Sequence, residues 1–285
     1  MRIGFRLVDV FTDRPLAGNQ LCVVPDGAGV PDDLMQAIAR EIGVSETTFV
    51  MSAGGDRYAM RIFTPAEELP FAGHPSLGTA FVLVLEGRIR SLATQSVKGG
   101  EYRMEVDVER ATAWMDQGEA TFGAVAEDLR TVAEAAGLIQ EELHPDLPPQ
   151  VVSTGLAHLV VPARTNDAVR RAWPDQRLMA GLMESFGTTG YYLASVGEDR
   201  AHARLFGAQG IMEDAATGSA AGPLGAYLVH RGAMAPGRLT ISQGAEMGRP
   251  STLLVDVVED GGVRVGGGVA IVGLGEFDLD LVSGA

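Results

Sequence analysis

The two halves of this 285-residue chain resemble each other, and such a repeat restricts the fold to architectures built from two similar units. Three pairs of segments match in the same order: 18–25 with 155–162, 61–63 with 204–206, and 73–87 with 218–232. Both members of the last pair open with a glycine, run through an apolar stretch of equal length and close with a glycine. A duplicated fold, in which strands surround one buried helix in each half, would account for all three matches.

Both apolar stretches have the composition of helices that lie inside a protein. The segment 75–86 carries apolar side chains on every side rather than along one stripe, and 220–230 has the same character. A helix that is apolar all round belongs in a core. Pro75 suits the first position of the first helix, which would place Gly73 and His74 at its N-terminus.

Short strand signals and glycine-rich turns surround these two helices. Further helices are expected at 32–42, at about 125–136 and at 175–186. We therefore predict an α+β protein of two pseudo-repeated domains, each a curved, mainly antiparallel sheet around a central buried helix. The domains would span 1–118 and 119–285, with the last strand of the chain returning to the first domain.

Charge and cysteine content narrow the range of partners. The net charge of −15 argues against nucleic acid and anionic membrane surfaces, because like charges repel. No apolar run approaches the roughly 18 residues of a spanning helix, and the first residues lack the apolar core of a signal peptide. The single cysteine, Cys22, excludes an intrachain disulfide framework and suits a reducing compartment. These features predict a cytoplasmic protein that binds neither nucleic acid nor membrane.

Polar groups gather where each buried helix begins. Gly73 and His74 open the first helix, and Asp214, Gly218 and Ser219 lie at the start of the second. Helix N-termini carry unpaired N–H groups and a positive dipole end, which attract anions. If an approximate twofold axis relates the halves, the two sets would converge on a cleft suited to a small substrate with a carboxylate. Simple helix capping is the alternative interpretation of these residues.

The repeat breaks at one carboxylate. Glu46 lies in the segment 45–49, and the loosely corresponding segment 188–191 carries no carboxylate. An isolated carboxylate in a duplicated frame is a candidate for a single general base. The alternative from spacing alone is a solvated carboxylate at the end of a strand.

Five groups of residues, spread over nearly the whole chain, form recognisable motifs. They are Asp9-Val10-Phe11-Thr12 with Ala17-Gly18-Asn19, Ser45-Glu46-Thr47-Thr48-Phe49, Arg61-Ile62-Phe63-Thr64-Pro65, Glu68-Leu69-Pro70-Phe71-Ala72-Gly73-His74-Pro75, and Glu213-Asp214 with Thr217-Gly218-Ser219-Ala220. In this order they closely resemble the PhzF family, the phenazine-biosynthesis-like proteins. The resemblance implies a diaminopimelate-epimerase-like fold, a cofactor-free isomerase and a homodimer.

The resemblance also implies roles for individual residues. Glu46 would be the acid/base that removes a proton from one carbon of the substrate and returns it to another. The residues that would bind or orient the substrate are Gly73, His74, Asp214, Gly218 and Ser219, with the two glycines acting through their backbone. The substrate would be a small anionic metabolite, cyclic or unsaturated. Two positions depart from the family pattern, since Ala215 and Gln20 stand where proline is common.

Several other interpretations are excluded or kept open. Racemases of the same fold that use two cysteines are excluded by the count of one, and no metal-binding motif is present. A non-catalytic protein that binds a small acid in the family cleft is the alternative function, although an isolated base favours an enzyme. Among the remaining polar residues, Asn19 would support the site, Glu68 and Glu213 would be structural or exposed, and His158 would make a local hydrogen bond.

Overall fold

The computed structural model describes residues 1–207 and 213–279. The chain forms two compact units: the first comprises Met1–Met115 and Gly266–Ala285, and the second comprises Asp116–Val265. The chain passes from the first unit to the second within strand β8 (Thr112–Glu119) and returns within strand β16 (Gly262–Asp278).

The first unit is a closed barrel of eight strands. Besides β8 and β16, its strands are β1 (Arg2–Val10), β2 (Asn19–Val24), β3 (Glu46–Gly54), β4 (Arg57–Phe63), β6 (Leu92–Val97) and β7 (Gly100–Asp107). They follow one another as β1-β2-β3-β4-β6-β7-β8-β16, and the pairing of β1 with β16 closes the ring. The short β5 (Glu68–Leu69) pairs with β4 outside this path.

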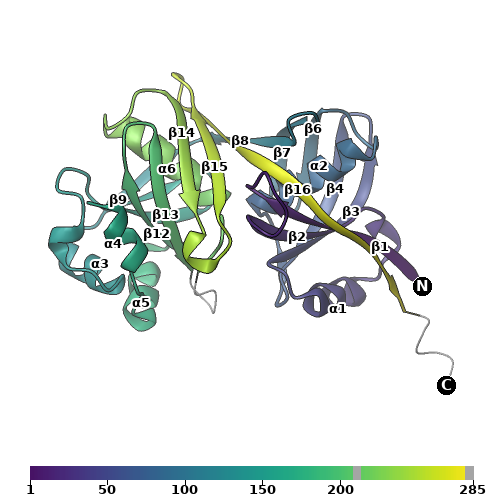
Figure 1. Ribbon diagram of the computed structural model, residues 1–285, viewed down its shortest axis with the longest axis horizontal. Helices are drawn as coiled ribbons and strands as arrows, with labels where there is room; N and C mark the ends of the chain where they lie inside the picture. Colours follow the sequence, from purple (N-terminus) through teal and green to yellow (C-terminus); the bar gives the residue numbers. More distant parts are fainter. Residues whose placement is uncertain (208–212, 280–285) are drawn as a thin grey trace. The chain divides into compact units, whose positions relative to one another are not determined.

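Helix α2 (Gly73–Leu85) lies among these strands, as Figure 1 shows. It is buried over its first eleven residues, 73–83, as an all-round apolar sequence requires. Gly78 lets the helix approach the barrel closely, because a Cβ there would lie 2.6 Å from Leu21 Cδ2. The 3-10 turn η1 (Gly27–Gly29) and helix α1 (Asp32–Ile42) pack on the outside of this unit.

The prediction for the start of α2 is wrong by two residues. The helix begins at Gly73 rather than at Pro75, and Ala72 is the residue that precedes it. Pro75 is tolerated as the third residue because the first N–H groups of a helix have no partner within it. His74 therefore lies in the first turn of the helix rather than before it.

The second unit repeats the arrangement with another run of strands. These are β9 (Thr121–Val125), β10 (Gln150–Ser153), β11 (Ala157–Ala163), β12 (Gly190–Val196), β13 (Arg200–Gly207), β14 (Gly237–Gln243) and β15 (Ser251–Val257). Their order is β16-β15-β14-β13-β12-β11-β10-β9. Helix α6 (Gly218–His230) is apolar and buried and packs against β10, β11 and β15.

The two units share a strand pattern as well as a central helix. In the first unit β2 pairs in parallel with β3, and β4 pairs in parallel with β6. In the second unit β11 pairs in parallel with β12, and β13 pairs in parallel with β14. In both, the second parallel connection carries the buried helix, and both helices are followed by a glycine with positive φ, 69° at Gly87 and 70° at Gly232. The predicted α+β fold with a central helix in each half is confirmed.

Smaller helices cover the outside of the second unit. They are α3 (Leu129–Ala135), η2 (Gln140–Glu142), α4 (Asn166–Arg171), α5 (Gln176–Phe186) and η3 (Ala245–Met247). The predicted helix at 125–136 is too long, because Val125 ends β9. Asp128 starts the helix instead, and its side chain accepts a hydrogen bond from Thr131 N.

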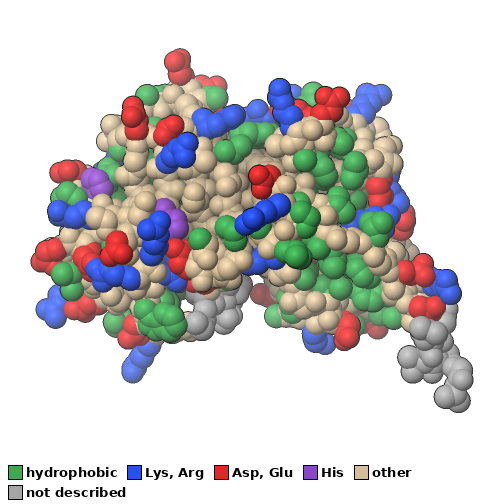
Figure 2. Space-filling view, in the orientation of Figure 1, with side chains coloured by type: hydrophobic (Ala, Val, Ile, Leu, Met, Phe, Trp, Pro, Cys, Tyr) green, Lys and Arg blue, Asp and Glu red, His purple; other side chains and the backbone are tan. Residues whose placement is uncertain are grey.

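Surface charge is mixed in sign. On the face shown in Figure 2, carboxylate and basic side chains are scattered over each unit rather than gathered by type. Within residues 1–207 and 213–279, no helix is long and apolar enough to span a membrane.

Candidate active site

Glu46 and His74 meet at the start of the buried helix of the first unit. Glu46 is the first residue of β3, and His74 is the second residue of α2. Glu46 Oε2 lies 2.9 Å from His74 Nε2, and the two side chains are only 14% and 8% exposed. This contact joins a carboxylate to an imidazole in a largely desolvated position, which is an arrangement suited to proton transfer.

The tautomer of His74 follows from its neighbours. Ser45 Oγ donates to Asn19 Oδ1 at 3.0 Å, so the other end of the Asn19 amide, Nδ2, is the donor that lies 3.3 Å from His74 Nδ1. Nδ1 of His74 is therefore an acceptor, and the proton of the neutral ring is on Nε2. From there it donates to Gln20 O, 3.2 Å away, whereas Glu46 Oε2 lies close to the same nitrogen without a hydrogen bond in the described part of the chain.

A tight loop between β1 and β2 places Asn19. Gly18 has a φ of 68°, and a Cβ there would lie 2.3 Å from Val10 O, so only glycine fits. Asp9 Oδ2 accepts a hydrogen bond of 2.7 Å from Leu16 N within the same loop. The prediction that Asn19 supports the site agrees with its contact to His74.

Gln20 stands where proline is common in the family pattern, and this difference leaves the contacts of His74 intact. His74 uses the backbone carbonyl of Gln20, and the side chain of Gln20 is exposed. A proline at that position would offer the same carbonyl.

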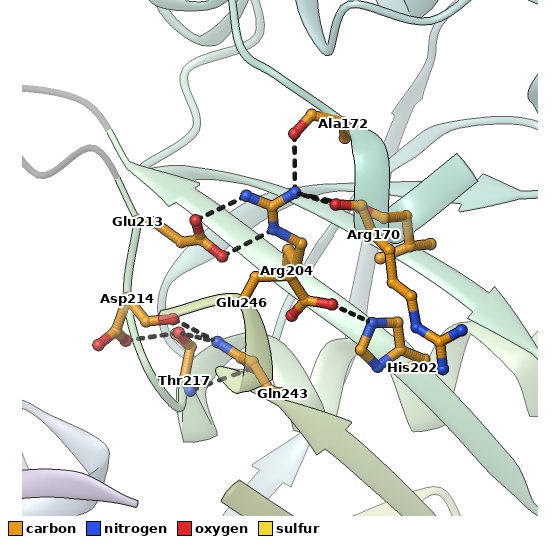
Figure 3. A network of polar contacts seen from close by, with 10 residues as sticks. Arg170, Ala172, His202, Arg204, Glu213, Asp214, Thr217, Gln243 and Glu246 are labelled. Carbon is orange, nitrogen blue, oxygen red and sulfur yellow. Dashed lines mark hydrogen bonds and ion pairs between the residues drawn. The ribbon is translucent and has the colours of Figure 1, made fainter. Parts of the chain in front are cut away.

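Asp214 is held through its backbone and through its side chain, and Figure 3 shows its bonds to Gln243 and Thr217. Its backbone forms a bridge with Leu205, and its carbonyl accepts a hydrogen bond of 2.9 Å from Gln243 Nε2. Its carboxylate accepts from Thr217 Oγ1 at 2.5 Å. Ser251 Oγ also donates to Ala215 O at 3.1 Å, so the segment around Asp214 is anchored even without a proline at 215.

Ser219 and Gly218 open α6. Gly218 O accepts a hydrogen bond of 3.0 Å from Gln117 Nε2, and Ser219 Oγ lies 3.1 Å from His158 Nε2. The expectation of a local hydrogen bond for His158 is therefore wrong, because its partner is 61 residues away in sequence. Burial lowers the pKa of His158 to about 4, so the ring is neutral at neutral pH.

The register of the strands identifies the counterpart of Glu46. In the first unit Leu21 on β2 pairs with Glu46 on β3. In the second unit His158 on β11, which matches Leu21 in the repeated segments 18–25 and 155–162, pairs with Gly190 on β12. Gly190 therefore occupies the position equivalent to Glu46, as the broken repeat in the sequence indicates.

Equivalent ion pairs support the segment before each helix. Arg61 binds Glu68 through Nε and Nη2, and Arg204 binds Glu213 in the same way. The two glutamates are structural, as expected. Sequence reasoning missed Gln243, a buried side chain that bonds Asp214, Thr217 and Tyr192, because a lone glutamine in a strand carries no signal of distant partners.

The structure thus groups the predicted site residues by unit. Glu46, Gly73 and His74 are neighbours in the first unit, and Asp214, Gly218 and Ser219 are neighbours in the second. In the part of the chain that is described, no group of three or more His, Cys, Asp or Glu side chains could hold a metal ion.

Two similar units, each with curved strands around a buried helix, define a protein of the racemase and epimerase fold. A hydroxyproline epimerase from Agrobacterium vitis has this fold, with a TM-score of 0.63 at 11% identity over 99% of this chain and 94% of its own. The phenazine biosynthesis-like protein family, PhzC-PhzF, matches residues 8–275. The chain belongs to this family.

Individual relatives agree with that assignment. The chain is 36% identical to trans-2,3-dihydro-3-hydroxyanthranilate isomerase from Pseudomonas fluorescens over 88% of each protein. The structure of a predicted epimerase from Pseudomonas aeruginosa matches with a TM-score of 0.85 and 38% identity, covering 97% of this chain and 99% of that one. A PhzF-family protein from Bacillus anthracis matches with a TM-score of 0.87 and 26% identity, covering 98% and 100%. The chain is a PhzF-type isomerase.

Proposed function

We propose that this isomerase moves a proton within a small metabolite that bears a carboxylate, with Glu46 as the acid and base. One observation carries the proposal: Glu46 is a largely buried carboxylate, 2.9 Å from His74 at the start of a buried helix, and glycine takes its place in the other unit. A solvated carboxylate at a strand end would not explain this placement.

In the proposed reaction Glu46 acts twice. The carboxylate takes a proton from one carbon, and the C–H electron pair moves into the adjoining unsaturated system. The resulting carboxylic acid then returns the proton to another carbon of the same system, so the product is an isomer and the enzyme is unchanged. His74 Nε2, which lies 2.9 Å from Glu46 Oε2, would hold the carboxylate in position during both steps.

The remaining site residues would bind the substrate. His74 and the backbone of Gly73 belong to the start of α2, and Gly218 and Ser219 belong to the start of α6. Unpaired N–H groups at such helix starts favour a carboxylate and stabilise negative charge that develops on the substrate. Asp214 would accept a hydrogen bond from a donor group of the substrate, a role that the family resemblance implies.

The substrate class is proposed from the relatives. The Pseudomonas fluorescens relative is named for trans-2,3-dihydro-3-hydroxyanthranilate, a cyclic, unsaturated acid. We propose a substrate of this class, handled by a cytoplasmic homodimer without a cofactor, as the family resemblance implies.

An ultraviolet assay with trans-2,3-dihydro-3-hydroxyanthranilate tests the proposal. Wild type should turn over the compound, and Glu46→Gln should lower kcat by about 10²- to 10⁴-fold, the usual contribution of a general acid or base. Glu41→Gln, on the exposed side of α1, is the control and should leave kcat unchanged. Full activity of Glu46→Gln would remove Glu46 from the mechanism, and no turnover by wild type would exclude this substrate.

A further inference from the structure

His158 and Ser219 connect β11 to the first turn of α6 in the second unit. His158 is 3% exposed, and its Nε2 lies 3.1 Å from Ser219 Oγ. Ser219 is half-buried, whereas Gly218 and Ala220 on either side of it are buried. The hydroxyl of Ser219 therefore has a buried partner on one side while its side chain keeps access to solvent.

The second nitrogen of His158 indicates which atom carries the proton. Nδ1 is buried and has no hydrogen-bond partner within residues 1–207 and 213–279. It lies against Gly190, where a Cβ would be only 2.9 Å from it. A lone pair tolerates a neighbouring C–H, but an N–H in this place would be a buried donor without an acceptor, which is the rarer and more costly case. The proton of the neutral ring therefore lies on Nε2.

This tautomer determines what Ser219 can do. Nε2–H donates to Ser219 Oγ, so the single hydroxyl proton of Ser219 must point to some other acceptor. No other hydrogen bond of Ser219 Oγ occurs in the described part of the chain. The hydroxyl is therefore left as a donor toward whatever lies at the helix start, and a carboxylate is the acceptor that suits both this hydroxyl and the helix dipole.

We propose that His158 is a positioning residue, which makes Ser219 a committed hydrogen-bond donor to the carboxylate of the substrate. The inference rests on the proposed function, since it gives a physical basis to Ser219 as a substrate-binding residue. It also explains the asymmetry of the repeat. A glycine at 190 leaves room for the His158 ring, whereas a larger side chain at that position would collide with it.

The tautomer itself can be measured without any substrate. Long-range ¹H–¹⁵N correlation spectra of protein labelled on its five histidines distinguish a protonated Nε2 from a protonated Nδ1. His158→Gln identifies the signal of His158 by its loss. At pH 7 the spectrum should show Nε2 protonated, and Ser219→Ala should shift that proton. A protonated Nδ1 would overturn the proposal whether or not the enzyme accepts the tested substrate.

Steady-state kinetics with trans-2,3-dihydro-3-hydroxyanthranilate test the consequence. His158→Leu and Ser219→Ala should each raise KM by about tenfold to a hundredfold, the range for a hydrogen bond to a charged group, while kcat changes much less. The double variant should be no worse than either single one. His158→Gln, which keeps an N–H donor, should recover most of the loss, and His230→Gln at the far end of α6 is the unchanged control.

The outcomes separate this inference from the proposed function. A high KM in Ser219→Ala together with a normal KM in His158→Leu would show that His158 does not act through Ser219. Normal KM in both variants, with Glu46→Gln inactive, would leave the isomerase mechanism in place and overturn the role of both residues. Circular dichroism of each variant checks that the fold is retained, and the tautomer spectrum decides the inference if wild type has no turnover.

Discussion

Arg204 and Glu213 form a two-pronged ion pair in the second unit, with Nε and Nη2 each 2.7 Å from a carboxylate oxygen. Arg61 and Glu68 form the same pair in the first unit, at 2.8 Å. The pairs differ in burial, because the side chains of Arg204 and Glu213 are 7% and 15% exposed and those of Arg61 and Glu68 are 25% and 27% exposed. One chain thus contains the same interaction in two environments.

This difference predicts unequal costs of breaking the two pairs. Glu213→Gln leaves the buried guanidinium of Arg204 without its counter-charge and should lower the free energy of unfolding by about 3 kcal/mol. Glu68→Gln, the matched variant, should cost about 1 kcal/mol, because Arg61 keeps its ion pair with Asp32 and is also open to water. Urea unfolding at pH 7 measures both. Equal losses would mean that burial does not control the strength of these pairs.

Contacts beyond the carboxylate add to the expected loss at Glu213. Arg204 Nη1 also donates to Val169 O, Arg170 O and Ala172 O at the end of α4, as Figure 3 shows for the last two. A displaced guanidinium would loosen this helix end. Increased amide exchange at residues 166–172 in Glu213→Gln, but not in Glu68→Gln, is therefore expected.

The buried His158 predicts a dependence of stability on pH. Burial lowers the pKa of its ring from 6.5 to about 4, so the unfolded chain binds a proton here at a higher pH than the folded protein does. Stability therefore falls as the pH drops from about 6.5 to about 4, by up to roughly 3 kcal/mol from this group. Urea unfolding from pH 7 to pH 4 should give a shallower decline for His158→Gln than for wild type. Parallel curves would show that His158 does not titrate in this way.

Cys22 should be inert in the folded protein. It is fully buried on β2, and burial raises the pKa of its thiol to about 12. Because the thiolate is the reactive species, a disulfide reagent at pH 8 should leave it unmodified and should react promptly in guanidinium chloride. Rapid reaction without denaturant would reveal that β2 opens under native conditions.

The charge of Asp214 should matter more than its shape. Asp214→Asn keeps an oxygen that can accept from Thr217 but cannot carry the charge-assisted bond proposed for the substrate. We expect kcat/KM to fall by about tenfold to a hundredfold with little change in stability. Asp146→Asn on the surface is the control. Unchanged kcat/KM in Asp214→Asn would confine Asp214 to a structural role.

The central helices could be predicted from sequence, and so could the one carboxylate, Glu46, at which the two halves differ. A helix that is apolar on every side is stable only in a protein core. The absence of a carboxylate at 188–191 marks Glu46 as the position where the repeat differs. The predicted start of α2 is two residues too late, because Gly73 and His74 do not favour a helix by themselves. The packing of the helix in the core and its dipole include them in the first turn. The helix expected at about 125–136 starts too early, because it includes Val125, the last residue of β9.

Long-range polar contacts could not be predicted. His158 bonds Ser219 across 61 positions, and Gln243 bonds Asp214 across 29. Nothing in the local sequence around either residue specifies such a partner, because the partner is brought close only by the strand order. The resemblance to the PhzF family pointed to Asp214 and Ser219 but not to the side chains that hold them.

Because β16 closes the barrel, we predict that the stability of the first unit depends on residues 266–278. Removal of residues 266–285 would leave β1 and β8 without the neighbour that closes the barrel. We expect the truncated protein to be protease-sensitive in residues 1–115, and a synthetic peptide of residues 262–279 to restore protection where a scrambled peptide does not. Resistance of the truncated chain would mean that the open barrel is stable by itself.

The same strand sets the order in which the two units can fold during synthesis on the ribosome. Arg2 pairs with Asp278, so β1 must wait until residue 278 has left the exit tunnel before the barrel of the first unit can close. Residues 116–265 are complete earlier and can fold first, although they are made second. During that interval the apolar helix α2 lacks part of its cover, which makes the unfinished chain a substrate for chaperones and delays closure of the first unit until β16 has been made.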